Sequence, residues 1–452
     1  MNKIFILLGF TILSNISIAQ QNQKYNFTLE QAIDFALDSN YTAINARRDI
    51  AIAIKKKWET TAGGLPQIDA NISYQNNLKQ PTTLLPAEIA GGEAGSFVPI
   101  IFGTKQNATL GATLTQLIFD GSYLVGLQAA KTFLDYSENA EEKTQLEVRR
   151  GVINAYGSVL LSKELVEIFE LNKTNLEKNI FETRAFYENG FTEEESVEQL
   201  EITLINLETQ LKNSERTLII AKQMFNLALG IDVESEVVLL DNLASLTQQN
   251  ISLEFLEENI KIENNIDYKI ANNFTEQQVL KLKLEKSYSI PNLIAFVNYG
   301  TQANSENFNF LNNDQKWYQS SVVGISMNIP ILSSGIRNAK TQQARIALEQ
   351  SETNLTEAYQ KVLLEINTAK NNYRFAIEIY NNNKKNLDLS KRVERKNEIK
   401  FLEGLATSFD LRSAQIQLYT AQQNYFEAML RVITTKADLE TVLNTPQLKA
   451  TN

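Results

Sequence analysis

The chain has 452 residues and a formal net charge of −10; 43% of its residues are hydrophobic and 21% are charged, which supports a sizeable core and argues against general disorder. It contains neither cysteine nor histidine, so thiol chemistry, imidazole catalysis and most zinc sites are excluded. The acidic balance argues against nucleic acid as a partner, because phosphate binding needs clustered lysine and arginine.

The N-terminal stretch has the features of a secretory signal peptide. Lys3 is followed by an apolar run from Ile4 to Leu13 and then by Ser17-Ile18-Ala19, which fits a small-x-small cleavage site. The run is too short for a spanning helix, and no longer apolar run follows it. We therefore expect cleavage of residues 1–19, export, no transmembrane helix, and a mature charge of about −11, which is −10 minus the +1 of the lysine.

The first strand-like segment, residues 66–76, alternates strictly between apolar and polar side chains. One face carries Ile68, Ala70, Ile72 and Tyr74, and the other carries Gln67, Asp69, Asn71 and Ser73. Residues 107–117 alternate in the same way. The segment between them, 78–106, is rich in proline and glycine and is interpreted as a loop. These patterns predict two strands, each with one apolar and one polar face.

A long helical stretch follows, from 124 to 188, without proline and with few glycines. It is about 65 residues, or roughly 100 Å if continuous, at 1.5 Å per residue. Gly190 then precedes a helix with a seven-residue apolar repeat, which predicts a coiled-coil seam. Its two seam positions carry Val197, Leu204, Leu211, Leu218 and Phe225, and Leu200, Leu207, Ser214, Ala221 and Ala228. Glycine favours the left-handed position at helix ends, so we expect the chain to reverse at this glycine.

The second half repeats this order of elements. Strands are predicted near 291–300 and 321–330, followed by a rod over 336–403, a glycine at Gly404 and a second seam. The second seam carries Leu411, Leu418, Tyr425, Val432 and Leu439, and Ala414, Ala421, Ala428, Thr435 and Val442. We therefore divide the chain into a first structural repeat (20–250), a second (251–445) and a tail (446–452).

The four strands indicate a membrane-spanning sheet. Each is about ten residues, the length that a tilted strand needs to cross a bilayer. A soluble sandwich would need a facing sheet, and nearly all the remaining sequence is helical. Four strands cannot close a barrel and lipid does not tolerate an open edge, so two copies, or three giving 12 strands, must pool them. Tyr74, Tyr299, Trp317 and Tyr318 lie near strand ends, as membrane-interface aromatics do, although soluble proteins also place aromatics there.

Because these features occur in the same order in both halves, the chain resembles the outer-membrane efflux protein family, also called TolC-like outer membrane factors. The segments that carry the resemblance are "GGLPQIDANISY", "TQLIFDGS", "SIPNLIAFVNY", "NIPILSSG", "NLALG" and the two tip glycines. The resemblance implies a mainly α fold with a transmembrane β part. In such a fold a long antiparallel coiled-coil helical barrel continues a 12-stranded trimeric outer-membrane β-barrel.

The resemblance also implies the protein's role and partners. The chain would be a homotrimeric exit duct in the outer membrane lipid of a Gram-negative bacterium, with helices extending into the periplasm. A periplasmic adaptor (membrane fusion) protein and an inner-membrane pump of the RND or ABC type would dock below it, in tripartite efflux or type I secretion. No enzymatic activity, cofactor or metal and no nucleic acid partner is expected.

In members of this family, the periplasmic gate has acidic residues six and nine positions after the second tip glycine. Here these positions hold Asp410 and Ser413, and their first-half counterparts are Ser196 and Gln199. The serine at the ninth position departs from the pattern. The first tip instead carries Glu193, Glu194 and Glu195 beside Gly190, and both tips, with Gly404, are expected to dock the adaptor.

Other interpretations of the same residues stay open. Acidic residues in the first turn of a helix also stabilise its positive N-terminal end, which is the preferred interpretation of the glutamate run. Trp58 is expected to pack at a helix junction rather than to mark a membrane interface. For the whole chain, the alternatives are a non-transporting periplasm-spanning coiled coil anchored in the outer membrane and a secreted helical adhesin or pore-forming toxin.

Overall fold

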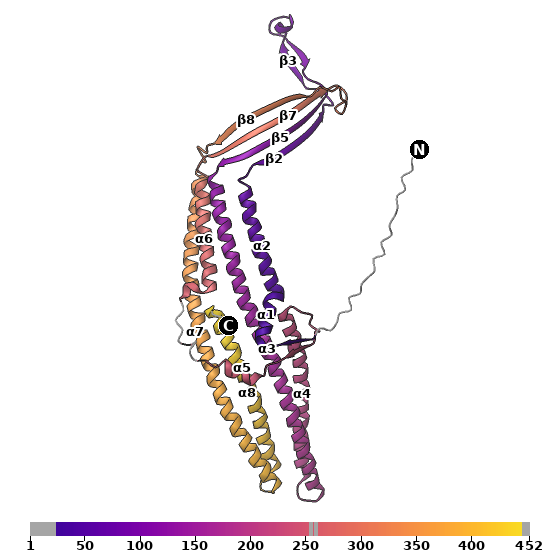
Figure 1. Ribbon diagram of the computed structural model, residues 1–452, viewed down its shortest axis with the longest axis vertical. Coiled ribbons are helices and arrows are strands. Elements are labelled where there is room, and N and C mark those ends of the chain that lie inside the picture. Colours follow the sequence, from indigo (N-terminus) through magenta and orange to yellow (C-terminus); the bar gives the residue numbers. More distant parts are fainter. Residues whose placement is uncertain (1–23, 253–255, 257–260, 445–452) are drawn as a thin grey trace, which may run out of the picture. The chain divides into compact units, whose positions relative to one another are not determined.

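The computed structural model describes residues 24–252, 256 and 261–444, so the predicted signal peptide (1–19) and tail (446–452) lie outside the described residues. The described chain is mainly helical with four strands paired in one sheet, which confirms the predicted fold class (Figure 1). The helices are α1 (Leu29–Ser39), α2 (Tyr41–Ala62), α3 (Gly121–Glu188), α4 (Glu194–Leu229), α5 (Leu243–Gln249), α6 (Ile266–Ser287), α7 (Ile336–Leu402) and α8 (Ser408–Leu443), with 3-10 turns η1 (Ala87–Ala90) and η3 (Ile262–Asn264). The strands are β1 (Tyr25–Phe27), β2 (Gln67–Asn76), β3 (Thr82–Pro86), β4 (Phe97–Ile101), β5 (Gln106–Phe119), β6 (Val237–Leu239), β7 (Asn292–Ser305) and β8 (Tyr318–Asn328).

The chain divides into two compact units, and each draws on both halves of the sequence. The strand unit comprises Ala46–Glu142 and Ile262–Val362; the helix unit comprises Met1–Asn45, Lys143–Lys261 and Leu363–Asn452. The units cut across the predicted sequence repeats because strands of the first half pair with strands of the second. The division into repeats describes the order of elements and stays a prediction. Within the described residues, no helix combines the length and apolar character needed to cross a membrane.

In the strand unit, the sheet has the order β2-β5-β7-β8, with every neighbouring pair antiparallel. The chain enters the sheet at the α2–β2 junction and leaves it at the β5–α3 junction. These two junctions are in close contact. Tyr123 donates its hydroxyl to the carbonyl of Thr61 at 3.1 Å. A Cβ added at Gly64 would lie 2.3 Å from the tyrosine ring, so only glycine fits under it. Gly64 therefore lets the α2–β2 junction approach the start of α3.

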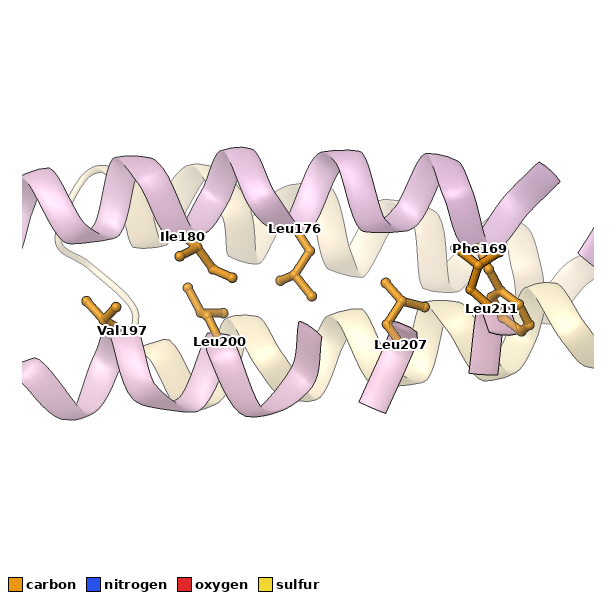
Figure 2. Packing of buried hydrophobic residues seen from close by; sticks show 7 residues of the cluster. All are labelled: Phe169, Leu176, Ile180, Val197, Leu200, Leu207 and Leu211. Atoms are coloured by element: carbon orange, nitrogen blue, oxygen red, sulfur yellow. The ribbon is translucent and has the colours of Figure 1, made fainter. Parts of the chain in front are cut away.

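In the helix unit, α3 and α4 form one antiparallel hairpin and α7 and α8 form another. Figure 2 shows Leu176 and Ile180 of α3 pointing toward Leu200 of α4 within a buried apolar cluster. In the second hairpin, Leu387 of α7 packs with Leu418 and other residues of α8. The predicted heptad seams face these contacts. Their members are all buried or half-buried: on α4 Val197, Leu200, Leu204, Leu207, Leu211, Ser214, Leu218, Ala221, Phe225 and Ala228, and on α8 Leu411, Ala414, Leu418, Ala421, Tyr425, Ala428, Val432, Thr435, Leu439 and Val442.

Buried polar groups also join α3 to α8 and to other parts of this unit. Arg149 of α3 donates to the carboxylate of Glu440 of α8 at 2.6 Å, and both side chains are buried. Asp241 accepts hydrogen bonds from the hydroxyl of Tyr156 and from the backbone N–H of Leu29, each at 2.8 Å. Burial, reinforced by this aspartate, raises the pKa of the Tyr156 phenol well above its usual range. Groups buried this deeply need partners, so these bonds fix how the helices of the unit pack together.

Three predictions are wrong in detail. The proline- and glycine-rich segment 78–106 is not only a loop, because it contains the hairpin β3–β4. Strand β7 extends to Ser305, beyond the end predicted near residue 300. Trp58 does not pack at a junction within the chain, since 61% of its surface is exposed. The last error has a simple cause: of the side chains of α2, only Ala43 and Ala53 are buried within this chain.

Candidate functional site

The strand register sorts the sheet's side chains into an apolar face and a polar face. Residues paired directly across antiparallel strands point to the same side of a sheet. One row across the four strands is Ile68, Leu114, Val297 and Val323, all apolar. The row three residues further along is Asn71, Gly111, Gly300 and Ser320, without a single large apolar side chain. The polar–apolar alternation of the four strands is therefore in register, so that apolar residues of neighbouring strands lie side by side.

The apolar face is uncovered in this chain. Ile72 of β2 and Val323 of β8 are 78% and 79% exposed, and Ile68, Ile325 and Met327 are exposed as well. A contiguous apolar surface of this kind marks a membrane or a partner, because burying it is worth about 25 cal/mol per Å². The sheet therefore needs an apolar environment on one side and water on the other.

The polar face carries amide and hydroxyl groups joined by hydrogen bonds. Asn107 donates to the side-chain oxygen of Asn304 on the next strand at 3.0 Å, and Thr109 donates to Asn107 at 3.0 Å. Phe296 interrupts this face, because it lies in one row with Gln67 and Thr115. The ring lies over Gly324, where an added Cβ would come within 2.6 Å of it. A glycine on the neighbouring strand thus makes room for the one large aromatic ring in the middle of the polar face.

Both edges of this sheet are open. Among the described residues, the outer edges of β2 and β8 pair with no further strand. Unpaired backbone groups each cost several kcal/mol in hydrocarbon, so an open edge is not stable in lipid. If the apolar face lies in a membrane, other copies must supply the missing neighbours.

The predicted interface aromatics have different positions. Tyr74 and Tyr299 lie on the apolar face, each about half exposed at 49% and 48%. Trp317 is half-buried and packs against a small cluster that includes Ala303. Tyr318 pairs with a glutamine of the polar face, so the register argues against contact of Tyr318 with lipid.

Two aromatic residues of this site were missed from the sequence. Phe308 and Phe310 follow β7, in the segment between the third and fourth predicted strands. Their rings meet Tyr74 edge-on at 5.6 and 5.8 Å, and Phe310 also contacts Trp317. The two phenylalanines in "NFNFL" were the available signal. Their cluster fixes the β7–β8 connection onto the end of the sheet.

At the other functional region, both helical hairpins turn at glycine. Gly190 has φ 77° and Gly404 has φ 72°, in the left-handed region that favours glycine. The following residue closes each helix by donating back to a carbonyl five residues earlier: Phe191 to Phe186 at 2.9 Å and Leu405 to Lys400 at 2.7 Å. This is the Schellman geometry, which ends a helix and reverses the chain within a few residues.

The glutamates of the first tip are exposed at the start of α4. Glu193 is the N-cap residue and makes no side-chain capping bond, while Glu194 and Glu195 lie in the first turn. Glu195 accepts a hydrogen bond from the side-chain amide of Gln199 at 2.7 Å. Negative charge at this end of a helix is favourable by about 0.3–1 kcal/mol. The geometry agrees with the helix-stabilising interpretation and leaves the carboxylates accessible to a partner.

At the second tip, Asp410 is part of a capping box that sequence reasoning did not recognise. It accepts from the hydroxyl of Thr407 at 2.7 Å and from its backbone N–H at 3.0 Å, and Thr407 caps α8 in return. These two bonds, the side-chain one first, lower the pKa of Asp410. The signal was the spacing Thr-x-x-Asp before an apolar repeat. The carboxylate is exposed and charged, and it also has a structural role.

The other predicted gate residues lie around the same two helix starts. Ser408 donates to the side-chain oxygen of Gln199 at 3.4 Å, which links the start of α8 to that of α4. Ser196 accepts from the hydroxyl of Thr192 at 3.1 Å. Ser413 is exposed on α8. The structure thus brings the first-half and second-half tips together in one region of the helix unit.

Comparison with known proteins finds similarity to one family. The family model described as "Outer membrane efflux protein" matches residues 281–445. A curated relative, the outer membrane protein TolC of Vibrio cholerae serotype O1, is 21% identical over 337 residues, which is 74% of this chain and 76% of the relative.

Solved structures share the fold over nearly the whole chain. Similar structures include CusC, with a TM-score of 0.74, 16% identity and coverage of 93% of this chain and 92% of CusC. VceC of Vibrio cholerae matches with a TM-score of 0.71, 15% identity and coverage of 92% and 96%. The CmeC outer membrane channel of Campylobacter jejuni matches with a TM-score of 0.73, 14% identity and coverage of 92% and 85%. At these identities the structural matches establish the fold alone.

Proposed function

We propose that this chain, a member of the outer membrane efflux protein family, is the exit duct of a tripartite efflux or type I secretion system. The protein is an outer membrane protein of an efflux channel family, and the family and its fold are those of channels rather than enzymes. The observation that carries the proposal is the sheet with one apolar face, one polar face and two open edges. A wall with these properties separates lipid from a water-filled passage.

Three copies are the proposed assembly. Each chain contributes four strands, and about eight strands are the fewest known in closed barrels of this kind. Three copies give 12 strands and a wider passage than two copies. The long helices α3 and α7, of 68 and 67 residues, are proposed to extend into the periplasm.

The tips are proposed as the docking and gating region. Gly190 and Gly404, with the exposed carboxylates of Glu193, Glu194 and Glu195, form the surface offered to a periplasmic adaptor protein. An inner-membrane pump of the RND or ABC type completes the assembly and supplies the energy. Cargo selection is expected to lie with the pump.

The gate is proposed to consist of Asp410 and Ser413 with Ser196 and Gln199. Three copies of an exposed carboxylate in a narrow aperture would attract cations and repel anions. The pKa of Asp410 is lowered, so the carboxylate keeps its charge at neutral pH.

Planar-bilayer recordings of the purified assembly test the proposal. We expect discrete ion conductance with cation preference. Asp410→Asn removes the charge but keeps an acceptor for the capping bonds, so it should weaken cation selectivity and block by trivalent cations. Glu403→Gln, which removes an exposed charge just before the tip glycine, is the matched control and should change both much less. A correctly assembled trimer without conductance would favour a non-transporting scaffold, and unchanged selectivity in Asp410→Asn would remove Asp410 from the aperture.

A further inference from the structure

A cavity with charged walls lies in the helix unit, between the start of α1 and the helices α3, α5 and α8. Its volume is about 440 Å³, within the range of cavities that hold small organic molecules. All of its lining residues belong to this one unit. Five lining side chains carry a formal charge: Glu30, Arg149, Asp241, Lys436 and Glu440. Charges are costly to bury without partners, so their arrangement indicates what the cavity can hold.

The inner wall of the cavity has an excess of positive charge. Arg149 of α3 and Lys436 of α8 approach the carboxylate of Glu440 at 2.6 and 3.6 Å, and all three residues are buried. Two cations share one carboxylate, which leaves a net formal charge of +1 in this wall. Among the described residues, the Nε of Arg149 has no hydrogen-bond partner. A buried donor on a charged group is costly to leave unpaired, so this wall favours a negative group in the cavity.

The outer side of the cavity is negative. Asp241 is half-buried and Glu30 is exposed, so both carboxylates lie nearer to solvent than the inner wall does. Asp241 is held in place by the backbone N–H of Leu29 and the hydroxyl of Tyr156, each at 2.8 Å. Both donors are neutral groups, and neither cancels the charge of the carboxylate. The cavity is therefore polarised, with a positive interior and a negative outer side.

These features narrow the class of ligand. Ile153, Leu246 and Ile433 add apolar surface to the lining, which suits an aliphatic group. An inorganic anion would fill a small part of the volume and leave the outer carboxylates without a cation. Among the described residues, no group of acidic side chains is arranged to hold a metal ion. A molecule with a negative end, a positive end and an aliphatic part matches all three regions of the lining.

We propose that this cavity binds a small zwitterion of the size of an amino acid or short peptide. Its carboxylate would contact Arg149 and Lys436, and its ammonium group would face Asp241 and Glu30. Such a ligand touches α1, α3, α5 and α8 at once, so its binding stabilises the packing of these helices. The inference goes beyond the proposed duct and does not depend on it, because the cavity is complete within the helix unit.

Equilibrium dialysis of radiolabelled glycyl-leucine against the purified, assembled protein tests the proposal. This dipeptide carries both charges and an aliphatic side chain. We expect it to bind. We expect unlabelled N-acetyl-glycyl-leucine and glycyl-leucinamide, which each lack one charge, to compete at least about tenfold less well, because each loses hydrogen bonds to charged groups. No binding at millimolar dipeptide would overturn the proposal, and equal competition by the N-acetyl form would overturn the zwitterion in favour of an anion site.

Two neighbouring arginines locate the site. Arg149→Lys keeps a cation beside Glu440 but removes the Nε donor and the planar guanidinium, so it should weaken binding of glycyl-leucine by about tenfold or more. Arg150→Lys changes the next residue of α3, which does not line the cavity, and should leave binding unchanged. Equal binding by the two variants would overturn the placement, provided that both keep the parent's unfolding midpoint.

The exposed rim provides a measurement that does not disturb the buried pair. Glu30→Gln removes one outer charge at an exposed position, so the variant should fold like the parent. It should bind glycyl-leucine severalfold more weakly and leave competition by the N-acetyl form unchanged, because that form has no ammonium group. Unchanged affinity for glycyl-leucine in Glu30→Gln would overturn the role of the outer carboxylates. None of these readouts uses conductance, so their failure leaves the proposed duct untouched.

Discussion

The helical hairpin α7–α8 offers a quantitative test of the seam packing through Ala421. This side chain is 2% exposed and lies in a cluster with Leu387 of α7 and Leu418 of α8. Ala421→Leu adds three carbon atoms where no side of the residue faces solvent. Overpacking of this kind costs about 1–3 kcal/mol, and shortening the facing residue by Leu387→Ala alone costs about 2–5 kcal/mol.

Because the two residues belong to one cluster, their effects should not add. In Leu387→Ala/Ala421→Leu the new leucine fills the space that the old one left, so the double variant should be more stable than the sum of the single costs predicts, by an interaction energy of about 0.5–3 kcal/mol. Gln417→Leu, exposed on the same helix, is the control and should stay within about 0.5 kcal/mol of the parent.

The assay is unfolding of the detergent-solubilised protein at one fixed concentration, followed by helical circular dichroism. The midpoint of Gln417→Leu should match that of the parent, and the midpoint of the double variant should lie above the value expected from the sum of the two single costs. If Ala421→Leu unfolds together with the parent, or if the two changes are simply additive, the cluster is not tightly packed and the reasoning fails.

Three further predictions concern other parts of the chain. Gly324→Ala should destabilise the sheet by about 1–3 kcal/mol through its clash with the ring of Phe296, and Phe296→Ala should relieve that cost; equal losses with and without the ring, in thermal melts, would contradict the contact. Arg149→Met leaves Glu440 in a buried site without its closest cation and should cost about 3–5 kcal/mol in denaturant unfolding, so a loss below 1 kcal/mol would show that the pair is solvated. The pKa of Asp410 is lowered in the folded protein. The stability that its charged form adds to the start of α8 is therefore fully present above the ordinary aspartate pKa of about 4, and it is lost as the pH falls through the lowered pKa. The protection factors of amides at that tip, corrected for the intrinsic pH dependence of exchange, should therefore fall in acid in the parent, and an equal fall in Asp410→Ala would exclude this carboxylate as the cause.

The sequence by itself determined the elements and the face to which each side chain points. Alternation in Ile68–Tyr74 and the heptads from Val197 and Leu411 are local periodicities, and a strand or helix converts them directly into faces. The tip glycines are equally local, because a left-handed residue depends on backbone conformation at one position.

Only the tertiary structure decided which faces meet. Phe296 broke the pattern of its own strand, and its reason is Gly324 on the next strand, which no local rule reveals. The hairpin β3–β4 was missed in the proline-rich segment because its strands, in which Leu84 pairs with Pro99, do not alternate strictly between polar and apolar residues. Likewise, Trp58 looked like a packing residue until its helix proved to have few neighbours within the chain. Periodicity is fixed by neighbours along the chain, whereas partners far apart in sequence are chosen by the free energy of the whole packed arrangement.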